Sequence, residues 1–252
     1  MYLNINDITI YYETYGDNKK SILILPGWGN TRETFHHIIN NFKNNYKIYI
    51  LDYPALGKSP IPKKTLTIYD YTELIIEFMK KLNIKNPIII AHSFGGRITT
   101  LLSGYYKIPI KKLILIDIAG IKPKLTLKRY IKEKTYKTLK KLIKLLPKKV
   151  HKKTQEKLFK FFASSDYNNL PIQMRETFKN IVNEDLKKYL KKINNETLIL
   201  WGEIDKDTPL KDAYKIKKEI KNSALIILKN ATHYSYLNYP ILVNNIIYEF
   251  IK

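Results

Sequence analysis

Cysteine is absent from this chain of 252 residues, so disulfide bonds and thiolate metal sites are excluded. Long apolar runs are absent as well, since no stretch approaches the roughly 20 residues that a membrane-spanning helix needs. Residues 1–7 lack the basic and then apolar pattern of a secretory signal. We therefore expect a soluble cytoplasmic protein with no metal or other cofactor. Its length is enough to bury the core of one α/β domain, with or without an insertion.

Arginine is scarce and occurs only at Arg32, Arg97, Arg129 and Arg175, although the formal net charge is +23. The positive excess is therefore nearly all lysine, and it accompanies many Asn, Ile and Tyr residues, as is typical of a genome rich in A and T codons. Surfaces that bind nucleic acid usually enrich arginine, which grips phosphate and guanine with two donors. We expect no nucleic-acid partner.

One serine stands at a position suited to chemistry. The apolar run Ile88–Ile90 predicts a buried strand, which leads through Ala91 and His92 to Ser93 and then to Phe94-Gly95-Gly96. Residues this small permit a tight turn into a helix and would hold one hydroxyl exposed. A serine oxygen is a poor nucleophile alone, so the reaction would need a base, an acid that orients the base, and amide donors for an oxyanion.

Strand-like and helix-like segments alternate along most of the chain. This alternation predicts a mostly parallel sheet with helices on both faces. Segments 8–15 and 21–25 flank the turn signal Gly16-Asp17-Asn18, which predicts that they pair as a hairpin. Further strands are expected at 46–52, 88–92, 111–117, 197–202 and 224–228, and helices at 31–42, 68–82, 94–106, 210–220 and 240–251.

The alternation stops between about residues 121 and 190, where helical spacing predicts three helices dense in lysine. Their apolar positions are Leu139, Leu142, Ile143 and Leu146 before Pro147, then Phe159, Phe161 and Phe162, and after Pro171 Met174, Phe178, Ile181 and Val182. We expect an α/β core of residues 1–120 and 191–252 with a helical insertion of residues 121–190. Sites form at the carboxyl edge of parallel sheets, so an insertion there would roof a pocket.

The lysine-rich insertion leaves three alternatives open. A solvated surface without a role is favoured, because runs of charge usually are solvated. The lysines would otherwise attract anionic substrates, or contact an anionic membrane at its surface, since segment 125–146 combines an apolar stripe with a basic face.

A base and an acid for Ser93 are found after the later strands. His233 follows the last predicted strand, whereas the other histidines lie in an early helix, in the turn itself, or in the lysine-rich insertion. Asp205 follows the strand before it, and Asp207 and Asp117 are competing acids. The order Ser, Asp, His suits nucleophile, orienting acid and base. Asp117 and Asp52 are otherwise expected to be structural.

These motifs resemble those of α/β-hydrolase-fold serine hydrolases with a helical cap, over nearly the whole chain. Residues 91–95 resemble the G-x-S-x-G turn with Ala91 in place of the first glycine, 202–205 with Pro209 resemble the acid loop, and 231–233 resemble the G-H element. Residues 26–28 stand where the family usually has His-Gly-x, and 52–59 resemble its D-x-x-G-x-G-x-S loop. The resemblance implies an eight-stranded sheet and an oxyanion hole made by the backbone amides of Trp28 and Phe94. It also implies a substrate pocket that includes Trp28, Phe94 and Tyr234.

The resemblance implies a carboxylesterase-like enzyme that cleaves a carboxylic ester through an acyl-enzyme on Ser93. Thioesters, amides and lactones are related substrates of the same small-molecule acyl class. Hydrolysis of a carbon-carbon bond is an alternative, although the aromatic residue after the histidine is Tyr234 where those enzymes have Trp. A non-catalytic ligand-binding protein of the same fold is the second alternative. The oligomeric state stays open.

Overall fold

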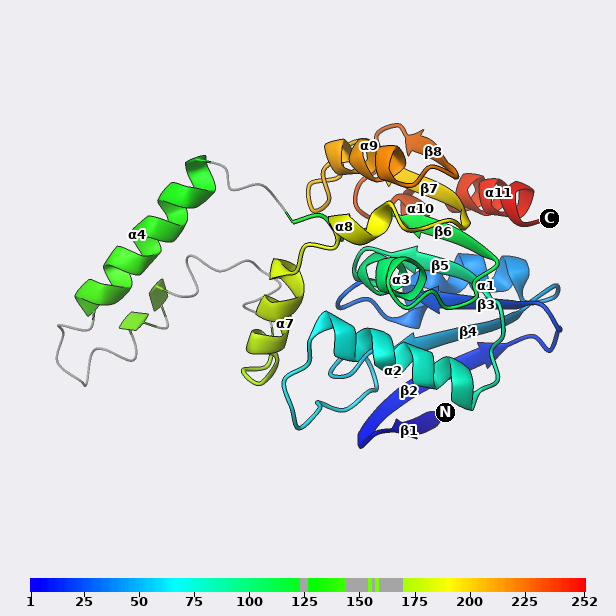
Figure 1. Cartoon of the computed structure of the whole chain (residues 1–252), viewed down its shortest axis with the longest axis horizontal. Helices are drawn as coiled ribbons and strands as arrows, with labels where there is room; N and C mark the ends of the chain where they lie inside the picture. The colour runs from blue at the N-terminus through cyan, green and yellow to red at the C-terminus, as the bar shows by residue number, and fades with distance from the viewer. Residues whose placement is uncertain (123–126, 144–153, 156, 159–169) are drawn as a thin grey trace. The chain divides into compact units, whose positions relative to one another are not determined.

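The computed structural model describes residues 1–122, 127–143, 154–155, 157–158 and 170–252 (Figure 1). Eight strands form one sheet in the order β1-β2-β4-β3-β5-β6-β7-β8. Their bounds are Tyr2–Ile5 (β1), Ile8–Tyr15 (β2), Ser21–Leu25 (β3), Lys47–Asp52 (β4), Ile88–His92 (β5), Lys112–Ile116 (β6), Glu196–Gly202 (β7) and Ser223–Leu228 (β8). The six strands from β4 to β8 in this order pair in parallel, and β1 and β2 are antiparallel. The mostly parallel eight-stranded sheet is therefore confirmed.

The predicted hairpin between segments 8–15 and 21–25 is wrong. β2 pairs with β1 on one side and with β4 on the other, whereas β3 lies between β4 and β5. β1 and β2 instead form a hairpin, and its two turn residues, Asn6 and Asp7, have φ of 47° and 64°. Two left-handed residues in a row give a turn whose twist matches the flanking strands. Gly16 instead ends β2 in a loop where a Cβ atom would lie 2.2 Å from the Lys43 carbonyl oxygen.

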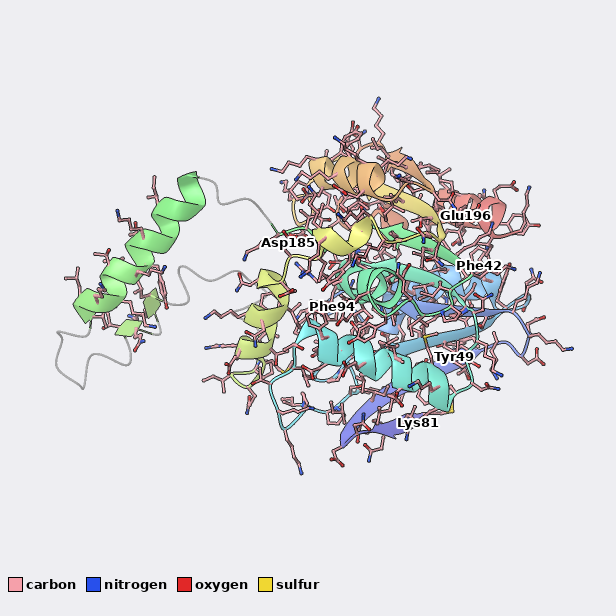
Figure 2. The ribbon with its side chains drawn as sticks, in the orientation of Figure 1. Phe42, Tyr49, Lys81, Phe94, Asp185 and Glu196 are labelled. Atoms are coloured by element: carbon pink, nitrogen blue, oxygen red, sulfur yellow. The ribbon has the colours of Figure 1, made fainter. Side chains whose placement is uncertain are left out.

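Helices cover both faces of the sheet, because alternate residues of each buried strand point to opposite sides. One core packs the odd-numbered residues of β3 and β5, such as Leu23 and Ile89, against α2 (Ile68–Lys81), α3 (Phe94–Gly104), α8 (Lys187–Leu190) and α9 (Leu210–Glu219). The other core packs the even-numbered residues against the short 3₁₀ helix Arg32–Phe35, α1 (His36–Phe42), α10 (Ser235–Asn238) and α11 (Pro240–Ile251). Figure 2 labels Phe42 from the second core and Phe94 from the first.

The chain divides into two compact units, residues 1–122 with 180–252 and residues 123–179. The first contains the whole sheet. The second contains α4 (Leu127–Ile143) and most of α7 (Met174–Asn183), two of the three helices expected between residues 121 and 190. The expectations at Leu125, at Leu146 and Pro147, and at residues 159–162 lie outside the described residues. Across the described ranges, no helix combines the length and apolar character needed to cross a membrane.

Candidate active site

Ser93 lies between β5 and α3 in a strained backbone conformation, with φ of 46° and ψ of −111°. The turn brings α3 so close to the sheet that a Cβ atom on Gly95 would lie 2.0 Å from the Leu25 carbonyl oxygen. A Cβ atom on Gly96 would lie 2.3 Å from the Ile118 side chain. Ala91 is fully buried within β5 and keeps its place in the sheet between Leu25 and Leu115. The sharp turn therefore forms with alanine at the position where the related motif has glycine.

Three side chains from separate strand ends form one chain of hydrogen bonds. His233 Nδ1 lies 2.8 Å from Asp205 Oδ2, and His233 Nε2 lies 2.9 Å from Ser93 Oγ. With Nδ1–H donating to the carboxylate, Nε2 carries the lone pair that accepts the serine proton. The structure thus brings together the three residues that the sequence assigns as base, acid and nucleophile.

The carboxylate of Asp205 is held by its own loop. The backbone amides of Asp207 and Thr208 donate to Oδ1 at 2.8 Å and 2.9 Å, and the Thr208 hydroxyl donates to Oδ2 at 2.6 Å. Burial alone would raise the pKa of Asp205, but the hydrogen bonds from His233 and Thr208 lower it below its ordinary value. Asp207 contributes its amide to this loop and its side chain is exposed, so Asp205 is the acid in contact with His233.

Burial would lower the pKa of His233, but the hydrogen bond to Asp205 and its negative charge raise that pKa above the ordinary value. The imidazolium that forms when His233 takes a proton is therefore stabilised where it stands. A neutral imidazole beside a hydroxyl and a buried carboxylate can remove a proton and return it, as general base and general acid require.

Asp117, the competing acid, binds two loops and not the imidazole. Its carboxylate accepts hydrogen bonds from the backbone amides of Gly202, at 2.7 Å, and of Ser235, at 3.1 Å. These two residues flank the acid loop and the base loop. Burial is the main reason that the pKa of Asp117 is raised, to about 7. Asp52 is likewise structural, since its carboxylate accepts the amide of Lys58 and closes the loop after β4.

The resemblance implies that the backbone amides of Trp28 and Phe94 bind an oxyanion. Phe94 is the first residue of α3, where an amide has no partner within the helix. The amide of Gly95 donates to the Pro26 carbonyl at 3.0 Å, which fixes the start of α3 against the loop that carries Trp28. The rings of Trp28 and Phe94 lie edge to face with centroids 5.1 Å apart. Phe94 follows Ser93 directly and its ring contacts Trp28, and the Tyr234 ring lies 5.6 Å from the His233 ring between centroids.

The sequence patterns do not indicate Thr208, nor the hydrogen bonds that the buried side chains of His92 and Asn30 make behind His233. His92 Nε2–H donates to the His233 carbonyl at 2.8 Å, and His92 Nδ1 accepts from the Asn30 amide at 3.0 Å. Asn30 Oδ1 accepts from the Tyr234 hydroxyl at 3.3 Å. The available signal was a histidine inside a strand that is otherwise apolar, since a buried polar group needs hydrogen-bond partners.

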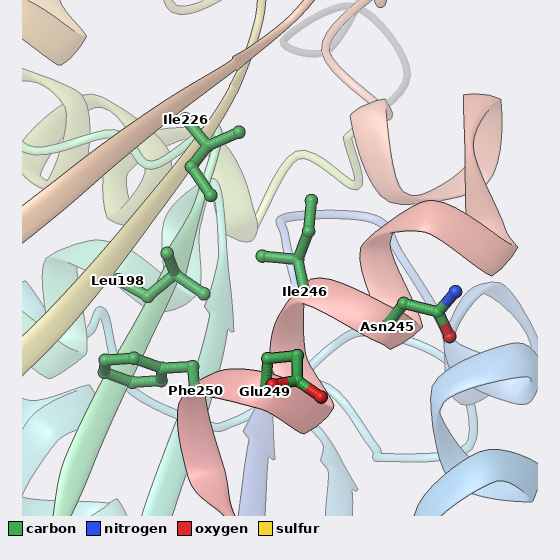
Figure 3. Close-up of a pocket in the computed structure, with 6 residues that line it drawn as sticks. All are labelled: Leu198, Ile226, Asn245, Ile246, Glu249 and Phe250. Carbon is green, nitrogen blue, oxygen red and sulfur yellow. The ribbon is translucent and has the colours of Figure 1, made fainter.

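A groove of about 460 Å³ lies elsewhere, between β7, β8 and α11. Figure 3 shows its lining of Leu198, Ile226, Asn245, Ile246, Glu249 and Phe250. None of the predicted site residues lines it, so this groove is separate from the serine site.

Asp205, Asp207 and His233 each place one atom that could bind a metal within 4.8 Å of the others. The atoms of Asp205 and His233 that face each other are already joined by a hydrogen bond. The arrangement therefore fits proton transfer better than metal coordination.

Comparison with known proteins places these observations in a family. The family described as the alpha/beta hydrolase fold matches residues 20–240. A pimeloyl-[acyl-carrier protein] methyl ester esterase of Wigglesworthia glossinidia brevipalpis is 29% identical, with 96% of this chain and 97% of that protein aligned. A 2-hydroxy-6-oxononadienedioate/2-hydroxy-6-oxononatrienedioate hydrolase of Pseudomonas putida is 22% identical, with 97% and 92% aligned.

Solved structures share the fold at lower identity. An alpha/beta hydrolase enzyme from a Medee basin deep-sea metagenome library superposes with a TM-score of 0.76 at 20% identity, covering 99% of this chain and 96% of that one. The enol-lactonase from Burkholderia xenovorans LB400 has a TM-score of 0.76 at 17% identity, covering 100% and 99%. At these identities the likeness extends to the fold alone.

Proposed function

Because this chain belongs to the α/β-hydrolase family, we propose that it is a serine hydrolase that cleaves carboxylic esters through an acyl-enzyme on Ser93. The observation that carries this proposal is the hydrogen-bond chain from Ser93 through His233 to Asp205. Three polar side chains from distant parts of the sequence meet in the order that acyl transfer requires.

In the proposed mechanism, His233 removes the proton of Ser93 as its oxygen attacks the ester carbonyl. The amides of Trp28 and Phe94 donate to the oxyanion of the tetrahedral intermediate. His233 then gives its proton to the leaving alcohol, and Asp205 stabilises the imidazolium throughout. Water, activated by the same base, releases the acid product and restores Ser93.

Specificity is proposed to lie with Trp28, Phe94 and Tyr234 as pocket residues and with residues 121–190 as a helical cap. Phe94 lies in a cluster of aromatic rings with Trp28, Tyr53 and Tyr71, which suits an apolar acyl group. The curated relative at 29% identity acts on the methyl ester of a carrier-bound acyl chain. Methyl esters of acyl chains are therefore the first substrates to test, and the net charge of +23 suits an anionic acyl donor.

A fluorophosphonate probe tests the mechanism. We expect the folded wild type to label and Ser93→Ala not to label, because the probe reacts with an activated serine. A panel of methyl esters, thioesters and lactones, with a dienone acid as a carbon-carbon substrate, then ranks the substrate classes by kcat/KM. Equal labelling of Ser93→Ala would contradict the assignment. A folded wild type that neither labels nor turns over any substrate would favour a non-catalytic ligand-binding protein.

A further inference from the structure

We propose that His92, Asn30 and Tyr234 form a clamp that positions His233 relative to Ser93. The three side chains are called the clamp below. This inference rests on the proposed function, since it assigns positioning residues for the same reaction.

The clamp is a closed ring of hydrogen bonds around one peptide. The Tyr234 hydroxyl donates to Asn30 Oδ1, Asn30 Nδ2–H donates to His92 Nδ1, and His92 Nε2–H donates to the carbonyl oxygen of His233. Residues 233 and 234 are adjacent in the chain, so the backbone closes the ring. The clamp therefore holds His233 by its carbonyl group and, through Tyr234, by the residue that follows.

The position of His92 in the chain links the base to the nucleophile. His92 precedes Ser93 directly, so the backbone that sets the serine hydroxyl also carries the donor to His233. The base is thereby aligned with the nucleophile at the end of β5, independently of its bond to Asp205. An error of about 1 Å in such an alignment costs on the order of 100-fold in rate.

The three side chains of the clamp are neutral. His92 is fully buried and ringed by Phe35, Tyr234 and Tyr236, with ring centroids 6.5 Å, 5.4 Å and 5.0 Å away. Burial, together with the nearby His233, lowers the pKa of His92 to about 3. The ring therefore stays neutral across the working pH range, with its proton on Nε2, and keeps one acceptor for Asn30 and one donor for His233.

Three substitutions of His92 separate its two hydrogen bonds from its volume. His92→Phe keeps a ring and removes both bonds, His92→Asn keeps an acceptor near the Nδ1 position, and His92→Gln keeps a donor near the Nε2 position. We expect kcat to fall about 10- to 100-fold in His92→Phe and His92→Asn, with KM within about twofold of wild type, because alignment acts in the transition state. His92→Gln should recover most of the lost kcat. His37→Gln, on the exposed face of α1, is the matched control.

A second measurement reads the position of His233 without turnover. The chain has only five histidines, so the C2 protons can be followed by NMR during a pH titration and assigned with His233→Gln. The titratable groups that face His233 from each neighbouring element are Asp205 and Asp207 after β7, Asp117 after β6, His92 in β5 and Tyr234. We expect the pKa of His233 to fall by about half a pH unit or more in His92→Phe, because a misplaced imidazole loses part of its bond to Asp205.

The outcomes are distinguishable. A folded His92→Phe variant with wild-type kcat and wild-type His233 titration overturns the clamp. If His92→Phe does not fold, Tyr234→Phe decides, since it removes one partly exposed hydroxyl. Tyr234→Phe is expected to lower kcat and the His233 pKa, and wild-type values of both would overturn the clamp. If the wild type has no activity at all, the proposed function has failed, and the His233 titration still decides whether the clamp holds this residue.

Discussion

His233 is held from two sides that differ in chemistry. On the imidazole side, Asp205 and Thr208 present a buried carboxylate and a hydroxyl, and the pKa of His233 is raised. On the backbone side, neutral His92 donates to the His233 carbonyl, and the neutral Asn30 amide accepts from the hydroxyl of the next residue, Tyr234. The charge of the base is therefore set mainly by contacts to its imidazole, and its position mainly by contacts to its backbone. Mutations on the two sides should therefore give different kinetic signatures.

The largest effect is expected on the imidazole side from Asp205→Asn. We expect kcat to fall about 10³- to 10⁴-fold, because an amide favours the wrong tautomer and cannot stabilise the imidazolium. Neutral His233 is the active form, so kcat/KM of the wild type rises with pH through a pKa above the ordinary 6.5. Removing the carboxylate charge should shift that acid limb to lower pH. A full pH profile of both proteins checks this, and an unshifted limb would mean that Asp205 does not set the His233 pKa.

His92→Phe, on the backbone side, is expected to have the next largest effect. Its loss in kcat should be at least about tenfold smaller than that of Asp205→Asn, because the tautomer of His233 is preserved. Equal losses from the two substitutions would mean that position and charge are not separately supported.

Thr208→Val tests one hydrogen bond on the imidazole side, and its effect should be smaller than that of Asp205→Asn. This substitution keeps the shape and removes the hydroxyl that donates to Asp205 at 2.6 Å. We expect kcat to fall about tenfold, which corresponds to about 1.4 kcal/mol, close to the lower end of the range for a hydrogen bond to a charged group. Thr208→Ser keeps the hydroxyl and is the control, and it should remain within about threefold of wild type. Equal activity of the Val and Ser variants would remove Thr208 from the mechanism.

The smallest effect on rate is expected at Asp117, which joins the two loops but contacts neither nucleophile nor base. Its pKa is raised by burial from 3.8 to about 7. The unfolded chain therefore releases this proton before the folded protein does, and the free energy of unfolding contributed by Asp117 falls as pH rises from 3.8 to about 7. The pKa of His233 is also raised, so His233 likewise makes the free energy of unfolding fall as pH rises. This contribution is present in every variant that keeps His233.

Asp117→Asn should flatten this dependence, as measured by urea unfolding at intervals between pH 5 and about 8, where folded proteins are usually most stable. The rate should stay within about threefold of wild type, since the hydrogen bonds of the Asp117 carboxylate go to the backbone amides of Gly202 and Ser235 and not to Ser93 or His233. A slope that equals that of the wild type would show that Asp117 is ionised in the folded protein throughout this range.

Much of the sheet was predictable because its central strands are buried on both faces. Runs such as Ile88–Ile90 and Leu113–Ile116 are continuously apolar for that reason. The partner of each strand was less predictable. The strand-like pattern of segment 8–15 fits equally well beside segment 21–25 or between β1 and β4. Only the tertiary structure selects between these pairings.

The candidate site was predictable where it depends on strand ends. Ser93, Asp205 and His233 each follow a parallel strand, and these strand ends share one edge of the sheet. Their catalytic roles stay predictions. Contacts that depend on loop paths, such as Asn30 with His92 across 62 residues of sequence, leave no periodic signal. Strand ends alone do not separate Asp205 from Asp117, because both follow neighbouring strands, and it is the resemblance of residues 202–205 with Pro209 to the acid loop that favours Asp205.

The bond between Ser93 and His233 joins residues 140 positions apart, and the whole of the unit 123–179 lies within that loop. In polymer terms, the entropy of closing a loop grows only with the logarithm of its length, and each doubling costs about 0.6 kcal/mol. β6 and β7, which flank the insert in sequence, pair directly with each other. Inserts of quite different length could therefore be exchanged during evolution at little cost to the closing of the site, while the sheet edge that carries the reactive groups is preserved.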